Sequence, residues 1–112
     1  MTTEALDALA AAYWDNFLNE SASSLGRDWT RLDEADGIFE SGGQPAIDLL
    51  LRLIVTAPRD RDGWLSYLLV GPIELMWQRD TDQRRLVEAS AQSGELAEAL
   101  SYLEPGGGLR RH

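Results

Sequence analysis

The chain has 112 residues, of which 44% are hydrophobic and 26% are charged, a composition typical of one globular domain with a sizeable core. It contains neither cysteine nor lysine, and its single histidine is His112. The residues present therefore exclude a disulfide framework, a thiolate metal site, a Ser-His-Asp triad and any mechanism that needs a lysine amine.

The net charge of −9 is unevenly spread along the chain. Residues 1–51 contain ten acidic and two basic residues, whereas residues 52–112 contain nine acidic and eight basic residues. A negative field of this kind repels nucleic acid and anionic lipid, so we expect neither to bind directly. It favours a basic protein partner; the alternative is that the charge serves solubility alone.

Acidic residues also occur at the start of the sequence. Glu4 and Asp7 lie where an export signal would carry positive charge. No apolar run approaches the roughly 18–20 residues that a helix needs to span a bilayer. We therefore expect no membrane segment and a cytoplasmic location.

The first predicted element is an amphipathic helix. Thr2 or Thr3 is suited to cap its start, and Glu4 lies in its first turn. Its apolar residues have the spacing of a helix with one buried face: Leu6, Leu9, Ala10, Tyr13, Trp14, Phe17 and Leu18. The polar stretch SASSLG then predicts a loop over residues 21–26.

Two further helices are expected in the middle of the chain. A weaker helical pattern extends from Trp29 to Phe39, and the SGGQP stretch after it ends with Pro45, which suits the first position of a helix. Residues 46–57 are apolar on nearly every face, and this predicts a helix at the centre of the fold. Pro58 is expected to end that helix.

The last part of the chain also has a helical pattern. Asp60 or Asp62 is expected to cap a short buried helix, and Asp80 is expected to cap a later one. A final helix is predicted over residues 96–103, before Pro105. No segment alternates convincingly with the period of two that a half-buried strand would have.

The most apolar stretch, WLSYLLVGPIELMW at residues 64–77, is interrupted by Gly71-Pro72. Proline lacks an N–H and disfavours a helical conformation in the residue before it, so we expect one helix to end at Val70 and another to begin at the proline. Glu74 then lies where a helix dipole favours a carboxylate. We interpret the break as a corner with a capping carboxylate; the alternative is that Glu74 is an acid or base with a raised pKa.

The candidate partner-binding residues lie in the acidic segment of residues 28–40. They are Asp28, Trp29, Asp33, Glu34, Asp36 and Glu40. Trp29 is the tryptophan most expected to be exposed, because charged residues surround it, and tryptophan is a frequent anchor at protein interfaces. The other three tryptophans fit apolar stripes and are expected in the core.

The same acidic segment permits a second interpretation. Asp33, Asp36 and Glu40 have the i, i+3, i+7 spacing of one helical face, and three carboxylates are suited to Mg²⁺. A solvated charged face explains the same spacing more simply. We therefore expect no metal, no cofactor and no catalytic residue.

Three features resemble a family of small acidic bacterial domains of unknown function. They are Trp29, the Ala57-Pro58 end of an apolar helix, and the block VGPIELM from Val70 to Met76, which is similar to an "AGPLEDLL"-like block of that family. The chain departs from the family pattern at Val70, where a small residue is usual. The resemblance implies an all-α fold and a bacterial source, and it implies no catalytic residue.

These observations predict an all-α fold, a compact orthogonal bundle of five to seven short helices. Residues 1–104 would form the domain and residues 105–112 a flexible C-terminal tail. Our functional hypothesis is a non-enzymatic, immunity-type inhibitor that occludes a basic bacterial toxin or a basic nucleic-acid-handling protein. The alternative is a helical adaptor or regulatory domain that binds a peptide or helix in an apolar groove.

Overall fold

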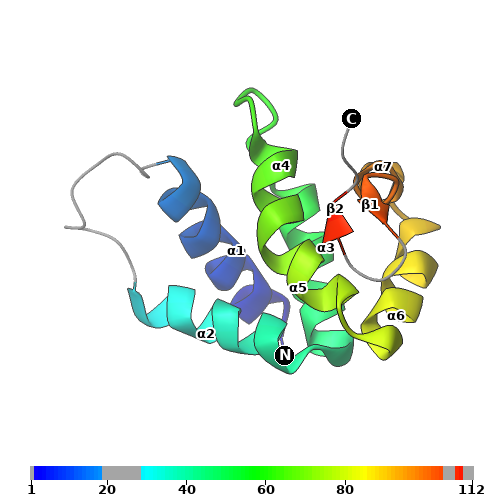
Figure 1. Ribbon diagram of the computed structural model, residues 1–112. Coiled ribbons are helices and arrows are strands. Elements are labelled where there is room, and N and C mark those ends of the chain that lie inside the picture. The colour runs from blue at the N-terminus through cyan, green and yellow to red at the C-terminus, as the bar shows by residue number, and fades with distance from the viewer. Residues whose placement is uncertain (1, 19–28, 105–107, 110–112) are drawn as a thin grey trace.

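The computed structural model describes residues 2–18, 29–104 and 108–109 of the chain. Its elements succeed one another as shown in Figure 1. In chain order they are α1 (Thr3–Leu18), α2 (Trp29–Ser41), α3 (Gly43–Val55), α4 (Trp64–Leu68), the π-helical turn η1 (Leu69–Ile73), α5 (Glu74–Trp77), α6 (Asp80–Ser90), α7 (Gly94–Leu100), β1 (Leu103–Glu104) and β2 (Gly108–Leu109).

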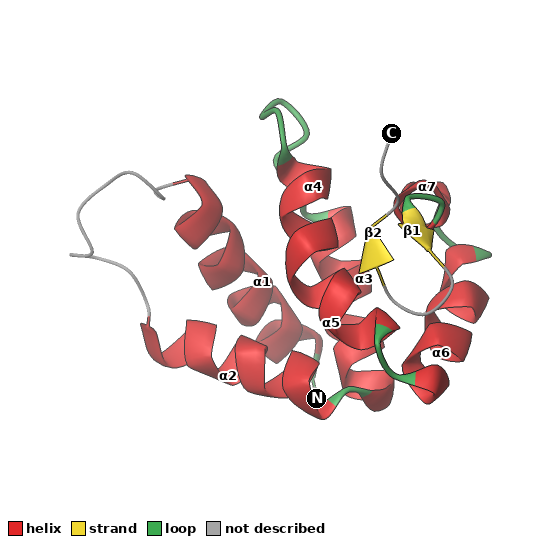
Figure 2. Ribbon diagram, in the orientation of Figure 1, coloured by secondary structure: helices red, strands yellow, loops and turns green. Residues whose placement is uncertain are grey.

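The predicted all-α fold is confirmed (Figure 2). Because α4, η1 and α5 follow one another without a gap, they form one kinked helix, and the described residues contain six helices in a compact globule. β1 and β2 pair antiparallel, with Leu103 opposite Leu109 and Glu104 opposite Gly108. β2 belongs to the segment predicted as a tail; the rest of that segment, residues 105–107 and 110–112, lies outside the described residues.

Helix α3 forms the centre of the core. It contacts α1, α2 and α6. Six of its residues are buried: Ala46, Ile47, Leu49, Leu50, Leu53 and Ile54. Each fully buried leucine or isoleucine contributes about 1.5–3 kcal/mol, so this helix is a major source of stability. The prediction of a central helix is confirmed, although the helix begins earlier than expected and Pro45 is its third residue, still within the first turn, where N–H groups lack intrahelical partners.

Aromatic side chains attach α1 to the rest of the domain. The ring centroid of Tyr13 lies 6.0 Å from that of Phe39 on α2 and 5.5 Å from that of Tyr67 on α4. The indole N–H of the neighbouring Trp14 donates to the carbonyl of Leu53, at 3.0 Å and in a buried position. Edge-to-face and tilted ring pairs of this kind stabilise beyond the area that they bury.

Arg79, at the start of α6, joins this helix to the end of α2 and pairs with a buried carboxylate. The guanidinium of Arg79 donates to the carbonyl of Phe39, at 3.1 Å, and to the carbonyl of Glu40. Arg79 also lies 3.5 Å from the carboxylate of Asp82, which is only 2% exposed. These carbonyls near the end of α2 thereby gain a cationic donor, which the helix dipole favours at this end.

Asp82 also holds the turn between α2 and α3. One of its carboxylate oxygens accepts the N–H of Gly43, at 3.0 Å. Gly42 and Gly43 have φ angles of 69° and 77°, which disfavour any residue with a side chain. A Cβ atom added to Gly42 would lie 2.3 Å from a carboxylate oxygen of Asp82, so only glycine fits this close approach.

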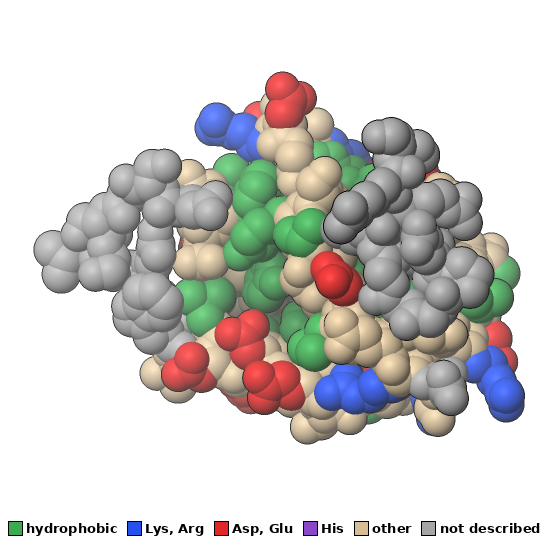
Figure 3. Space-filling view, in the orientation of Figure 1, with side chains coloured by type: hydrophobic (Ala, Val, Ile, Leu, Met, Phe, Trp, Pro, Cys, Tyr) green, Lys and Arg blue, Asp and Glu red, His purple; other side chains and the backbone are tan. Residues whose placement is uncertain are grey.

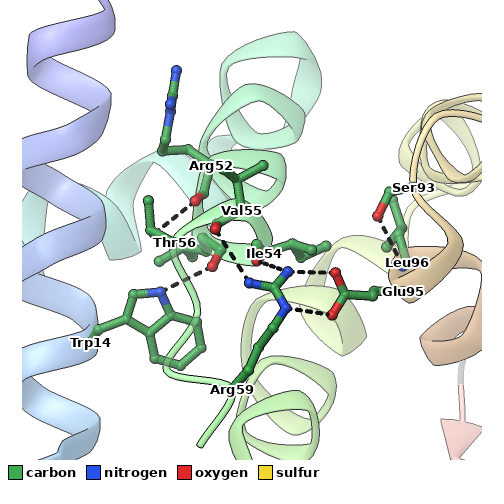
Figure 4. A network of polar contacts seen from close by, with 10 residues as sticks. Trp14, Arg52, Ile54, Val55, Thr56, Arg59, Ser93, Glu95 and Leu96 are labelled. Carbon is green, nitrogen blue, oxygen red and sulfur yellow. Dashed lines mark hydrogen bonds and ion pairs between the residues drawn. The ribbon is translucent and has the colours of Figure 1, made fainter.

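Arg59 binds carbonyls at the end of α3, as Arg79 does at the end of α2 (Figure 4). Its guanidinium donates to the carbonyls of Ile54 and Val55, and it forms a two-point contact with the carboxylate of Glu95 on α7. Its guanidinium carbon also lies 5.3 Å from the ring centroid of Trp64. One arginine thus donates to the last carbonyls of α3 and links that helix to two other elements.

Several helix starts differ from the predicted ones. Thr2 does cap α1, because its hydroxyl accepts the N–H of Ala5 at 3.1 Å. The residue before α4 is instead Gly63, whose backbone is in the left-handed conformation, and no side chain caps this helix. Asp80 is the first residue of α6, and the cap position is occupied by Arg79, whose side chain binds α2. The cap prediction was therefore wrong for three aspartates: Asp60, Asp62 and Asp80.

Candidate functional site

The acidic segment lies on α2, and Figure 3 shows acidic side chains gathered over this helix. Four of the predicted partner-binding residues are exposed on it: Asp33, Glu34, Asp36 and Glu40. Asp28 lies outside the described residues. Trp29 is the first residue of α2, but the structure does not describe its side chain, so the exposure of Trp29 stays a prediction.

A pocket of about 400 Å³ lies beside this acidic helix. It is formed by α1, α2 and the kinked helix α4–η1–α5. The lining residues are Tyr13, Asp36, Phe39, Glu40, Val70, Gly71, Pro72, Glu74, Leu75 and Gln78. In Figure 3 the acidic side chains over α2 adjoin a band of hydrophobic side chains between α1 and the kinked helix. The pocket thus combines apolar walls with carboxylates.

The pocket brings together only some of the predicted residues. Asp36 and Glu40 are four residues apart on α2, and this spacing places them on one helical face. Asp33 and Glu34 lie on the same helix but do not line the pocket. The third carboxylate of the pocket belongs to Glu74, from a segment 34 residues further along the chain than Glu40.

The kink at Gly71 gives the pocket its far wall. Gly71 has φ −105° and ψ −106°, outside the helical region, and Pro72 follows it without an N–H to donate. The expected break is confirmed, but the chain continues through the π-helical turn instead of ending one helix and starting another. Such turns often occur at functional sites. The kink leaves Val70 58% exposed at the pocket, although it is large and apolar.

Glu74 does not have the predicted capping role. No side chain caps the start of α5, because the preceding turn is itself helical and its N–H groups continue the hydrogen-bonded path. The residue is half-buried and lines the pocket. Glu74 does lie in the first turn of α5, as expected, but it forms no cap hydrogen bond, so only the capping part of the interpretation was wrong.

Tyr13 lines the pocket from α1 with a polar atom in an apolar setting. Its side chain is only 8% exposed. Its hydroxyl lies against Gly71, since a Cβ atom at that glycine would be 3.3 Å from the hydroxyl oxygen. No described residue makes a hydrogen bond with this hydroxyl. Burial, together with the nearby Tyr67 and Asp36, raises the pKa of Tyr13 far above its ordinary value, so the phenol keeps its proton.

The electrostatics of the pocket favour a cation. Partial desolvation, followed by repulsion from Asp33 and Glu40, raises the pKa of Asp36; because Asp36 as a whole is exposed, water limits this effect. Among the described residues, no arginine pairs with the carboxylates of Asp36, Glu40 or Glu74, and no arginine lines the pocket. Carboxylates grouped without a cation repel one another, and a positively charged occupant would relieve this repulsion.

The arrangement of the acidic residues does not match a metal centre. Asp33, Asp36 and Glu40 do share one side of α2, as their spacing indicates. However, within residues 2–18, 29–104 and 108–109, no three His, Asp or Glu side chains are placed so that they could hold a metal ion. The magnesium interpretation therefore has no geometric support in this part of the chain.

Sequence reasoning missed Tyr13 and the role of Glu74 in the pocket. Tyr13 fits the apolar stripe of α1, and nothing in that pattern indicates that its hydroxyl would face a pocket. The one available signal was the Gly71-Pro72 break, since a kink within a buried helix opens space between neighbouring helices. That break correctly marked the place but not the residues from α1 and α2 that complete it.

No helix in the described part of the chain is long and apolar enough to cross a membrane. Comparison of the chain with protein-family models, with curated protein sequences and with solved structures gives no match.

Proposed function

We propose that the protein is a non-enzymatic interaction module that binds and occludes a basic partner protein in the cytoplasm. A partner of this kind would be a basic bacterial toxin or a basic nucleic-acid-handling protein. The observation that carries the proposal is the pocket between α1, α2 and the kinked helix. It has three carboxylates, no arginine in its lining and an apolar wall that includes the exposed Val70.

The mechanism follows from the two parts of this surface. The exposed acids of α2, together with the net charge of −9, attract a basic surface over long range and raise the association rate. The apolar pocket walls then exclude water around the contact, which slows dissociation. An inhibitor with such a surface acts by covering the basic cleft of its partner and needs no chemical step.

A second candidate is an adaptor that binds a helix or peptide through apolar contacts. The band of hydrophobic side chains between α1 and the kinked helix in Figure 3 favours it. In that case the acids would set the orientation of the bound segment and apolar burial would supply most of the affinity. The two candidates differ in salt dependence, because electrostatic attraction between exposed groups is screened by salt and apolar burial is not.

A capture experiment with matched charge reversals tests the proposal. The immobilised protein is incubated with cell extract at low salt and eluted with a salt gradient. One variant reverses two pocket charges (Asp36→Arg with Glu40→Arg); the control reverses two exposed acids that lie away from α2 and the pocket (Asp62→Arg with Glu98→Arg). Both variants change the net charge equally.

The proposal expects a basic protein that elutes at a defined salt concentration, that is lost with the pocket variant and that is retained by the control. Equal loss with both variants would mean that net charge alone causes the capture and would refute a pocket-based mechanism. A partner that resists salt and is retained by both variants would support the adaptor instead.

A further inference from the structure

We propose that the pocket is a receptor for the guanidinium group of an arginine side chain on the basic partner. This inference rests on the proposed function and specifies the chemistry of the contact. Two independent observations carry it. One is the set of three carboxylates around the pocket, which form no ion pair among the described residues, and the other is Tyr13, a residue only 8% exposed whose hydroxyl has no hydrogen bond within the same part of the chain.

The carboxylates approach the pocket from two directions. Asp36 and Glu40 come from α2, and Glu74 comes from α5 on the kinked helix. An ammonium group is a compact point charge and remains strongly hydrated. A guanidinium instead presents five N–H donors in one plane and can satisfy acceptors on more than one side at once. A site with acceptors from two separate elements therefore suits arginine better than lysine.

The walls between the carboxylates also suit a planar cation. Phe39, Pro72 and Leu75 line the pocket, together with the ring of Tyr13. A guanidinium is weakly hydrated and packs its face on aromatic and apolar groups, whereas the stem of the arginine can lie along exposed Val70. The pocket volume of about 400 Å³ is at the lower end of the range for small-molecule sites and is ample for one side chain.

Tyr13 explains how the floor of the pocket can recognise the occupant. The phenolic oxygen has no hydrogen bond among the described residues, and it can accept an N–H from the guanidinium. Gly71 leaves this oxygen accessible, because a Cβ atom there would lie only 3.3 Å from it. Free arginine is a poorer fit than a peptide-borne side chain, since its own carboxylate would be repelled by the acidic rim.

A peptide titration tests this inference without knowledge of the natural partner. Three capped pentapeptides carry arginine, lysine or citrulline at the centre of neutral Gly and Ser residues; citrulline has the shape of arginine without its charge. Binding to the whole chain is followed by amide chemical-shift changes in NMR spectra, with Gly71 and Glu74 as reporters of the pocket. We expect the arginine peptide to bind about three- to tenfold more tightly than the lysine peptide, and the citrulline peptide to bind weakly or not at all.

Variants then assign the contact to named groups. Tyr13→Phe keeps the ring and is expected to weaken the arginine peptide by about three- to tenfold, the effect of one lost hydrogen bond. Its thermal unfolding should not be impaired, because the hydroxyl has no partner among the described residues. Glu74→Gln should weaken binding further, whereas Glu34→Gln removes the same charge from outside the pocket and should have little effect.

Equal affinity for the arginine and lysine peptides, unchanged binding by Tyr13→Phe, or shifts confined to another surface would each overturn the inference. Such a result would leave the proposed function in place if capture of a basic protein still depends on Asp36 and Glu40. The reverse result, an arginine preference together with capture that is indifferent to those two residues, would overturn the proposed function and retain the chemistry of the pocket.

Discussion

Replacement of Gly42 by alanine is expected to lower the free energy of unfolding by about 2–6 kcal/mol, and two effects contribute. The φ angle of 69° and ψ angle of −159° form a combination reserved almost entirely for glycine, and another residue there costs about 1–3 kcal/mol. The added Cβ atom would also lie 2.3 Å from a carboxylate oxygen of Asp82, so the carboxylate or the turn must move. Leaving the contacts of this buried group unsatisfied costs about 1–3 kcal/mol more.

Gly43→Ala is the matched control for this prediction. Gly43 also has a positive φ angle, of 77°, but its nearest new contact would be Pro45 at 3.9 Å. The control should therefore show only the backbone cost, about 1–2 kcal/mol. Urea unfolding, followed by far-ultraviolet circular dichroism, gives both free energies, provided that the dependence on urea concentration is unchanged.

A double variant isolates the clash with the carboxylate. Once Asp82→Ala has removed the carboxylate, Gly42→Ala should cost no more than the control substitution costs in the parent protein. A loss for Gly42→Ala within about 1 kcal/mol of that for Gly43→Ala would refute the reasoning, because the two positions differ mainly in the approach of Asp82.

Substitutions at four other positions have definite expected outcomes, and each can be measured by the same urea unfolding. Gly37→Ala lies on an exposed part of α2 with nothing within 4 Å of the new methyl group, so it should stabilise by about 0.5–1 kcal/mol; a loss would argue against a regular helix there. Trp14→Phe leaves the buried carbonyl of Leu53 without its donor and should destabilise by about 2–3 kcal/mol; an effect below about 1 kcal/mol would mean that water replaces the indole. Ser93→Ala removes the side-chain oxygen that accepts the N–H of Leu96, at the third position of α7, and should lower the free energy of unfolding by about 1 kcal/mol. Ser93→Thr keeps a hydroxyl there and should retain most of that stability. The folded protein holds the carboxyl proton of Asp36 more tightly than the unfolded chain does, so the free energy of unfolding falls as the pH rises from 3.8 through the raised pKa. Asp36→Asn should therefore stabilise the protein at neutral pH and have almost no effect below pH 3.8. The opposite pH dependence would contradict the origin of the raised pKa.

The fold was largely predictable because hydrophobic periodicity reports which side of each helix is buried. The apolar character of residues 46–57 on nearly every face led directly to a central α3, and Gly71-Pro72 led to the kink. The cap prediction failed at the start of α6 because the cap position is occupied by Arg79. The side chain of Arg79 binds carbonyls at the end of α2 instead of capping α6. This guanidinium reaches the carbonyls of Phe39 and Glu40, which lie far earlier in the chain. A contact over that separation leaves no local signal in the sequence.

The candidate site was predictable only in part, for the same reason. Asp36 and Glu40 belong to an acidic segment that the charge distribution already indicated. Glu74 and Tyr13 join them through the packing of α1 and the kinked helix against α2, and side-chain spacing within one helix contains no information about such distant neighbours. The hydroxyl of a tyrosine on an apolar stripe has the same pattern whether it faces solvent, a partner or a pocket.

The central position of α3 has a consequence for how the domain opens. Helices α1, α2 and α6 all contact α3. None of these three helices can separate from the domain without exposing leucine side chains of α3 to water. The amide hydrogens of this helix should therefore exchange with deuterium only during complete unfolding, and their slowest rates would report the global stability. Faster exchange is expected around Gly63, where the chain ahead of α4 is exposed and a partial opening leaves the leucines of α3 covered.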